Sequence, residues 1–106
     1  MIHLAVRRVD PEHLELFRKW MTQLNGPRRA EALATLDDEG CSHEIVVLIE
    51  GLEGPLAIYA MEVESIEHSR EAAGTSSHPI DVEHRAILEL ALGDRPPLDK
   101  ILDLHR

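Results

Sequence analysis

The segment "SHPIDVEH", Ser77 to His84, places two histidines and an aspartate around the expected start of a helix. Histidine titrates near neutral pH, so it can exchange a proton, donate a hydrogen bond or bind a metal. Pro79 suits the first turn of a helix, and Asp81 in that turn interacts favourably with the helix dipole. The segment therefore has two interpretations, a helix cap that contains histidine or the rim of a functional site.

The spacing around His84 predicts that its side chain points inward. Four apolar residues recur at helical spacing on this stretch: Ile80, Ile87, Leu88 and Ala91. His84 falls in the middle of that stripe, which should face the core. Asp81 lies one turn earlier, where a carboxylate can orient an imidazole or raise its pKa.

Several side chains from other segments are expected at the same end of the sheet. Glu44 and Tyr59 lie on two apolar runs that read as strands, and further candidates for the pocket wall are Trp20, Glu31, Glu62 and His78. This set favours general acid–base catalysis on a small, carbonyl-containing metabolite. His84 would be the base and Asp81 its orienter, with Tyr59 or Glu44 as the partner group.

Two other interpretations stay open. A divalent metal could bind His78, His84, Asp81 and Glu44, although the two histidines are six residues apart and lack the i, i+4 spacing that grips one ion. Alternatively, the protein is a non-catalytic ligand-binding or regulatory dimer in which His84 is a core residue. No motif for a nucleotide, haem or redox cofactor is present, so no cofactor is expected beyond a possible divalent metal.

Apolar periodicity and turn residues predict the elements that carry these side chains. We expect a strand over 2–9, a helix from Asp10-Pro11 to Asn25-Gly26, and a second helical stretch that Gly40 ends. Strands follow at 43–50 and 56–63, then a short helix from Ser65, a helix from Pro79 to about Leu92, and a last strand at "LDKILDLH". This order predicts one α+β domain over 1–106, a ferredoxin-like split βαβ fold with a four-stranded antiparallel sheet.

Both faces of the middle hairpin are apolar. In "HEIVVLIE", Ile45, Val47 and Ile49 point to one side while Val46 and Leu48 point to the other. Helices can cover only one side, and soluble proteins avoid a large exposed apolar patch. We therefore expect a homodimer in which two sheets face each other, with a small-molecule ligand held between or beneath them.

Charge and cysteine content exclude several classes of partner. Lys and Arg total 11 against 20 Asp and Glu, a net charge of −9, which should repel nucleic acid and anionic membranes. No apolar run approaches the length of a membrane span, and the start of the chain does not resemble a signal peptide. The single cysteine, Cys41, reads as a small strand residue, and the cytoplasm is the expected compartment.

Three segments resemble a known family: "EALATLDDEGCSHEIVVLIE", "YAMEVES" and "SSHPIDVEHRAIL". They are similar to a family of small bacterial domains of unknown function within the dimeric α+β barrels, the superfamily of the antibiotic biosynthesis monooxygenase-like proteins. Glu31, Glu44 and Tyr59 fall at polar positions of that family. The resemblance implies the fold and a dimer, but the superfamily includes oxygenases, isomerases, cyclases and haem-handling proteins, so it does not select a reaction.

Overall fold

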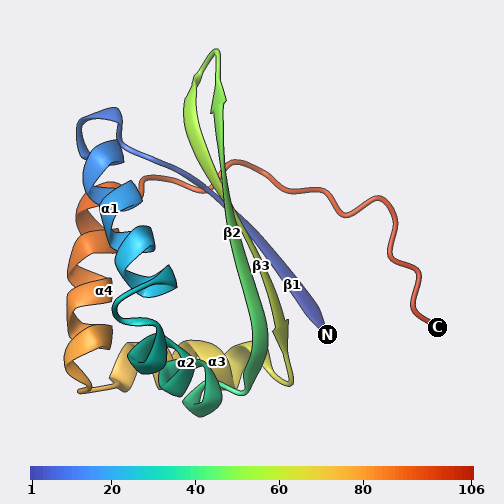
Figure 1. Cartoon of the computed structure of the whole chain (residues 1–106). Helices are drawn as coiled ribbons and strands as arrows, with labels where there is room; N and C mark the ends of the chain where they lie inside the picture. The colour runs from blue at the N-terminus through green and yellow to red at the C-terminus, as the bar shows by residue number, and fades with distance from the viewer.

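A three-stranded antiparallel sheet with helices on one side forms the body of the protein. The computed structural model describes residues 1–106 (Figure 1). The elements are β1 (Ile2–Arg8), the short 3₁₀ turn η1 (Pro11–His13), α1 (Leu14–Asn25), α2 (Arg29–Asp38), β2 (Cys41–Gly51), β3 (Gly54–Val63), α3 (Ile66–Thr75) and α4 (Pro79–Ala91). The predicted α+β class is confirmed.

The strands are ordered β1-β3-β2, so the long β2–β3 hairpin contributes two of the three strands. Across the sheet, Val46 pairs with Tyr59, which pairs with Ala5 on its other side. The hairpin turn is short, and Gly54 follows it with φ 104°, a backbone conformation that glycine adopts readily. The predicted pairing of these two strands is confirmed.

Local sequence signals set the helix boundaries close to where they were predicted. Asp10 accepts a hydrogen bond from the backbone N–H of Glu12 at 3.0 Å, and Pro11 opens the 3₁₀ turn that leads into α1. Ser65 caps α3 by accepting a bond from the backbone N–H of His68. Gly40, with φ 65°, reverses the chain between α2 and β2.

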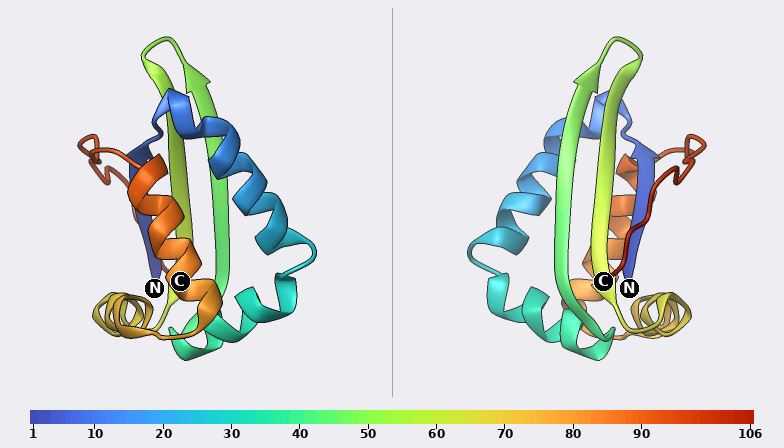
Figure 2. Two further views of the ribbon diagram at one scale, coloured as in Figure 1. Left: turned by 90° about the vertical axis from the view of Figure 1, so that its left-hand side faces the viewer. Right: turned by 90° about the vertical axis from the view of Figure 1, so that its right-hand side faces the viewer.

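The core lies between the sheet and the pair α1 and α4, which cover one face of the sheet (Figure 2). Its buried members are Val9, Phe17, Ala57, Ala91 and Leu92. The alanines have no exposed surface, because their small side chains let α4 and the central strand approach closely. On α1, the buried residues are Phe17 and Trp20, which are 2% and 6% exposed.

The predicted fourth strand at "LDKILDLH" is wrong. Pairing with β1 does begin, since the Gly93 N–H donates to the Arg8 carbonyl, the Arg8 N–H donates to the Asp94 carbonyl, and Val9 forms a bridge with Leu92. Pro96 and Pro97 lack the N–H groups that would extend the ladder. The chain beyond them has no regular structure and runs out on the side of the sheet opposite the helices (Figure 1).

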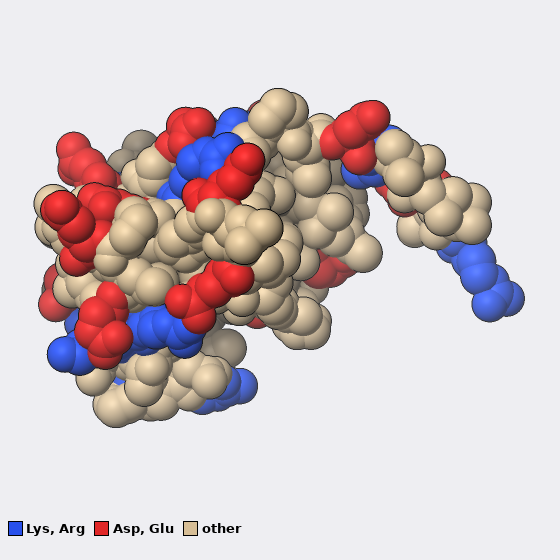
Figure 3. All heavy atoms as spheres, turned by 90° about the horizontal axis from the view of Figure 1, so that it is seen from above, with Lys and Arg blue, Asp and Glu red and all other residues tan.

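The outer face of the sheet, which the helices do not cover, is largely apolar. Arg8 and Glu62 lie at its ends, and its apolar strand residues are Ile2, Leu4, Val6, Ile45, Val47, Ile49, Leu56, Ile58 and Ala60. Ile45, Val47 and Ile49 are each 46–47% exposed. Seen from above, charged side chains crowd the helical side of the molecule, and the sheet side is mostly uncharged (Figure 3). No helix has both the length and the apolar character needed to cross a membrane.

Phe17 should dominate the stability of this core. We expect Phe17→Ala to lower the free energy of unfolding by about 3–5 kcal/mol, because it removes a large side chain that is only 2% exposed. Leu16→Ala is the matched control, since the neighbouring Leu16 is 36% exposed. Chemical denaturation measures both, and equal losses would place the core elsewhere.

Candidate functional site

A cavity of about 570 Å³ lies between the helices and β2. Its apolar wall comes from α1, α2, β2 and α4, including Met21, Leu36, Val46 and Ile80. Its titratable side chains are Arg29, Glu39, His43, Glu44, Asp81 and His84. The cavity therefore brings together several groups that can exchange protons.

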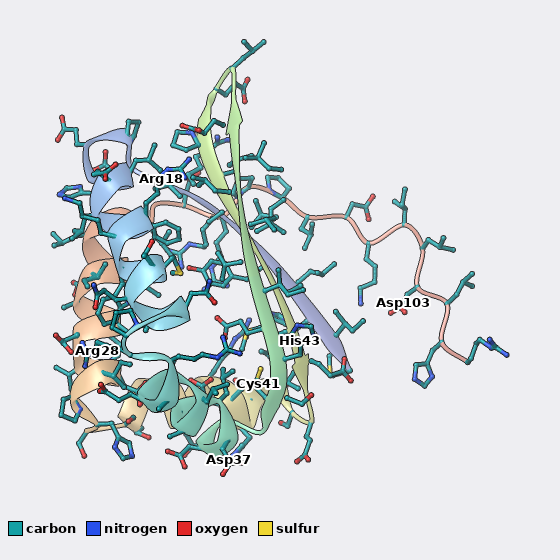
Figure 4. All side chains as sticks on the ribbon, in the orientation of Figure 1. Arg18, Arg28, Asp37, Cys41, His43 and Asp103 are labelled. Carbon is teal, nitrogen blue, oxygen red and sulfur yellow. The ribbon has the colours of Figure 1, made fainter.

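The pleat of the sheet decides which strand residues reach the cavity. Glu44 shares the helix-covered side of β2 with Val46 and Leu48, so its carboxyl group lies under the helices and is largely buried. His43 lies at the start of β2, next to a register shift, and is exposed at the edge of the cavity, on the side of the strand away from the helices (Figure 4). The sequence left open which face of the sheet lines a cavity, and in the structure the cavity lies on the helix-covered face.

His84 points inward from α4, as predicted, and bonds to a tryptophan. The Trp20 indole Nε1–H donates to His84 Nδ1 at 2.7 Å, and the two ring centroids are 6.0 Å apart. Because the indole nitrogen is only a donor, Nδ1 must be the acceptor and the proton of the neutral ring is on Nε2. Burial lowers the pKa of His84, so the neutral form is favoured near pH 7.

Trp20 is held in turn by Arg28, whose guanidinium carbon lies 5.5 Å from the indole centroid. Arg28 bonds to both carboxyl oxygens of Glu31 and also pairs with Glu83 on α4. Hydrogen bonding to Arg28 lowers the pKa of Glu31. Glu31, a predicted pocket residue, therefore supports the tryptophan from outside and does not line the cavity.

Two carboxyl groups in the cavity have raised pKa values. Burial, followed by the charges of Glu44, Asp81 and Asp38, raises the pKa of Glu39 to about 7. Burial also raises the pKa of Glu44. A carboxyl group that titrates near pH 7 can take up and release a proton under working conditions, which is the property required of a general base.

Asp81 lines the cavity but is not bonded to His84. Its carboxylate accepts a hydrogen bond from the Ser76 hydroxyl, in the turn that precedes α4. Arg85 fixes the same turn by donating to the backbone carbonyls of Ala73 and Ser76. Asp81 influences His84 through its charge, which raises the pKa of the ring, while the bond that orients the ring comes from Trp20.

The Tyr59 hydroxyl is the one buried side-chain polar atom with no hydrogen-bond partner. Tyr59 lies on the helix-covered side of β3, opposite Val46, but does not line the cavity. Burial and the nearby charge of Glu44 raise the pKa of Tyr59 far above its ordinary value. The hydroxyl thus stays protonated and unsatisfied behind the wall of the cavity.

Glu62 and His78 lie away from the cavity. Glu62 is on the opposite side of β3 and pairs with the amino group of Met1 at 3.3 Å. His78 is 64% exposed, and its Nε2 lies 3.5 Å from a carboxyl oxygen of Asp38. No group of three or more metal-binding side chains converges in the structure, so the proposed ligand set of His78, His84, Asp81 and Glu44 is not assembled.

Sequence reasoning missed Glu39. The residue follows the last turn of α2 and precedes Gly40, a position that reads as an exposed helix end. The only available signal was the acidic run "DDEG", which gives no indication that the third carboxyl group turns under the helix. Cys41, predicted to be a small strand residue, is buried on β2, and burial raises the pKa of its thiol.

Removing the orphan hydroxyl should not harm the fold. We expect Tyr59→Phe to raise the free energy of unfolding by about 1 kcal/mol, because a buried polar atom without a partner costs free energy. Tyr59→Leu serves as the control that also removes the ring, and it should be destabilising. A loss of stability in the phenylalanine variant, measured by urea denaturation, would reveal a partner for the hydroxyl.

Comparison with known proteins identifies a family. Residues 2–100 match the model of DUF6176, described as a family of unknown function. No curated protein and no solved structure matches the chain. The expected membership of a family of unknown function is thereby confirmed. Because the match spans almost the whole chain, this protein belongs to the DUF6176 family.

Proposed function

We propose that this protein is a homodimeric enzyme of the ferredoxin-like barrel type that performs acid–base chemistry on a small carbonyl compound in the cytoplasm. The observation that carries the proposal is the cavity that holds both Glu39, with a pKa of about 7, and a neutral His84. One group can accept a proton, and the other can donate a hydrogen bond. Catalysed enolisation needs this pair.

In the proposed reaction, the ionised Glu39 removes a proton from the carbon next to the carbonyl group. The electron pair of that C–H bond forms a carbon–carbon double bond, and the carbonyl oxygen becomes an enolate oxygen. His84 Nε2–H donates a hydrogen bond to this oxygen as its charge develops. Return of the proton to the same or another carbon completes an exchange or an isomerisation.

This assignment changes the roles expected from the sequence. His84 was predicted to be the base, but its Nδ1 lone pair is occupied by the Trp20 N–H. The remaining nitrogen, Nε2, carries the proton of the neutral ring and therefore acts as a donor. Glu39 takes the role of base. Burial, and then the charge of the neighbouring Glu44, keeps the pKa of Glu39 high.

The proposed activity can be tested by hydrogen–deuterium exchange. Small ketones, keto acids and lactones are incubated with the protein in D₂O, and proton NMR follows loss of the signal next to the carbonyl group. We expect exchange with at least one compound, at a rate that rises as pH increases through about 7, because Glu39 must be ionised to accept the proton. Glu39→Gln should slow the exchange about 100-fold or more.

Glu53→Gln is the control for the loss of a carboxylate, since Glu53 lies at the exposed β2–β3 turn, away from the cavity. Unchanged exchange in Glu39→Gln would refute the role of Glu39.

Binding of a compound without any exchange would favour the second candidate function, a non-catalytic ligand-binding or regulatory dimer. The half-apolar wall of the cavity suits such binding, and His84→Gln should then preserve it, because the glutamine carbonyl can still accept the Trp20 bond.

The homodimer is supported by the outer face of the sheet. This face carries nine apolar residues on three strands and no helix, an arrangement that monomeric proteins rarely expose. The tail projects from the same side and adds Leu98, Ile101, Leu102 and Leu104, which are 52–88% exposed. A second copy placed sheet to sheet would cover both sets of side chains.

A charge on the outer face should disrupt the dimer. We expect Val47→Lys to weaken self-association about tenfold or more, because an unpaired ammonium group would be buried between the sheets. Val82→Lys is the matched control, since Val82 lies on α4 and is 49% exposed against 46% for Val47. Light scattering after gel filtration gives the mass of each variant. A wild-type monomer at every concentration, or equal effects of the two substitutions, would contradict this dimer.

A further inference from the structure

We infer that Trp20 is a positioning residue that fixes His84 as a neutral hydrogen-bond donor facing the cavity, so that the site selects ligands that present an acceptor oxygen to Nε2. The inference rests on the proposed function for its biological meaning. Its geometry, the indole-to-imidazole bond, exists without a ligand. It can therefore be tested on the free protein.

The hydrogen bond selects one tautomer. The Nε1–N distance of 2.7 Å is short for a bond between two neutral nitrogen atoms, and both partners are largely removed from water, since Trp20 is 6% exposed. If the proton of the ring moved to Nδ1, two N–H groups would point at each other. The indole has no lone pair with which to adapt, so the alternative tautomer is strongly disfavoured.

The indole is itself fixed from its other side. Arg28 lies over the ring, and its guanidinium is tied to Glu31 on α2 and to Glu83 on α4. These contacts join the three helices that surround the cavity. Trp20 cannot turn away without breaking the stack, so the orientation of His84 is set by a chain of contacts that starts outside the site.

The direction of the ring then determines ligand chemistry. Nε2 has no hydrogen-bond partner within the chain, and the ring forms part of the cavity wall. A ligand that meets Nε2–H must offer a carbonyl or carboxylate oxygen, whereas a ligand amine would meet one donor with another. A metal ion is disfavoured at Nδ1, because the lone pair of that nitrogen already accepts the hydrogen bond from Trp20.

The surroundings of His84 act in opposing directions on its protonation. Asp81 on α4 favours the imidazolium, while Arg85 on the same helix and burial oppose it. Glu39 and Arg29 from the α2 side and Glu44 and His43 from β2 line the same cavity. Accepting the Trp20 bond adds to the preference for the neutral ring, because an imidazolium has no lone pair at Nδ1.

Nitrogen NMR on uniformly ¹⁵N-labelled protein tests the inference. We expect a two-bond coupling between Trp20 ¹⁵Nε1 and His84 ¹⁵Nδ1, and His84 ring shifts typical of the Nε2–H tautomer at pH 7. Exposed His78 and His105 provide internal references for solvated rings. An Nδ1–H pattern for His84, or no coupling while the Trp20 and His84 signals are both resolved, would overturn it.

A Trp20→Phe variant gives a second readout that loss of packing alone would not produce. Freed from the indole, the neutral His84 ring should become a mixture of both tautomers, and its pKa should rise. Trp20→Phe with an unchanged tautomer and pKa would refute positioning by Trp20. Arg28→Gln is the comparison variant. It removes the contact over the indole but keeps the Trp20–His84 hydrogen bond, so both the Nε1–Nδ1 coupling and the Nε2–H tautomer should persist. Because these experiments need no substrate, failure of the exchange assay would not affect their outcome.

Discussion

The alternation of side chains along β2 is the constraint on which the rest of the structure depends. Successive residues of a strand point to opposite sides, so Glu44, Val46 and Leu48 lie under the helices while Ile45, Val47 and Ile49 face away from them. The same strand thus supplies a carboxyl group to the cavity and an apolar row to the outer face. A shift of register by one residue would bury the wrong row and remove Glu44 from the site.

The helices that cover this sheet also determine the electrostatics of the site. Packing of α1 and α4 on Ala57 forms the core, and the cavity lies beside it among residues of α1, α2, β2 and α4. Burial there raises the pKa of Glu44, and burial together with repulsion from neighbouring carboxylates raises the pKa of Glu39. The acidic net charge of the chain, −9, is spread over the surface and is not the cause.

Much of the fold and part of the site could be predicted from the sequence, because those features depend on local patterns. Asp10-Pro11, Ser65 and the stripe that includes Ile80 and His84 act within one or two turns of a helix. The last strand could not be judged in this way, since the prolines that end the ladder mattered more than its apolar residues. Glu39 and His84 are 45 residues apart (84 − 39) and Trp20 and His84 are 64 apart, separations that periodicity does not relate.

The proposed dimer interface and the proposed acid–base cavity both use residues of β2. In the proposed dimer, a second sheet would press on Ile45 and Val47, the immediate neighbours of Val46 and Glu44. Exposed apolar side chains leave a strand freer to fluctuate than side chains packed on a partner. Pairing of two copies would therefore restrain the strand that carries Glu44, whose charge adds to the effect of burial on the pKa of Glu39. Dimerisation and the acid–base character of the cavity would be coupled through alternate residues of a single strand.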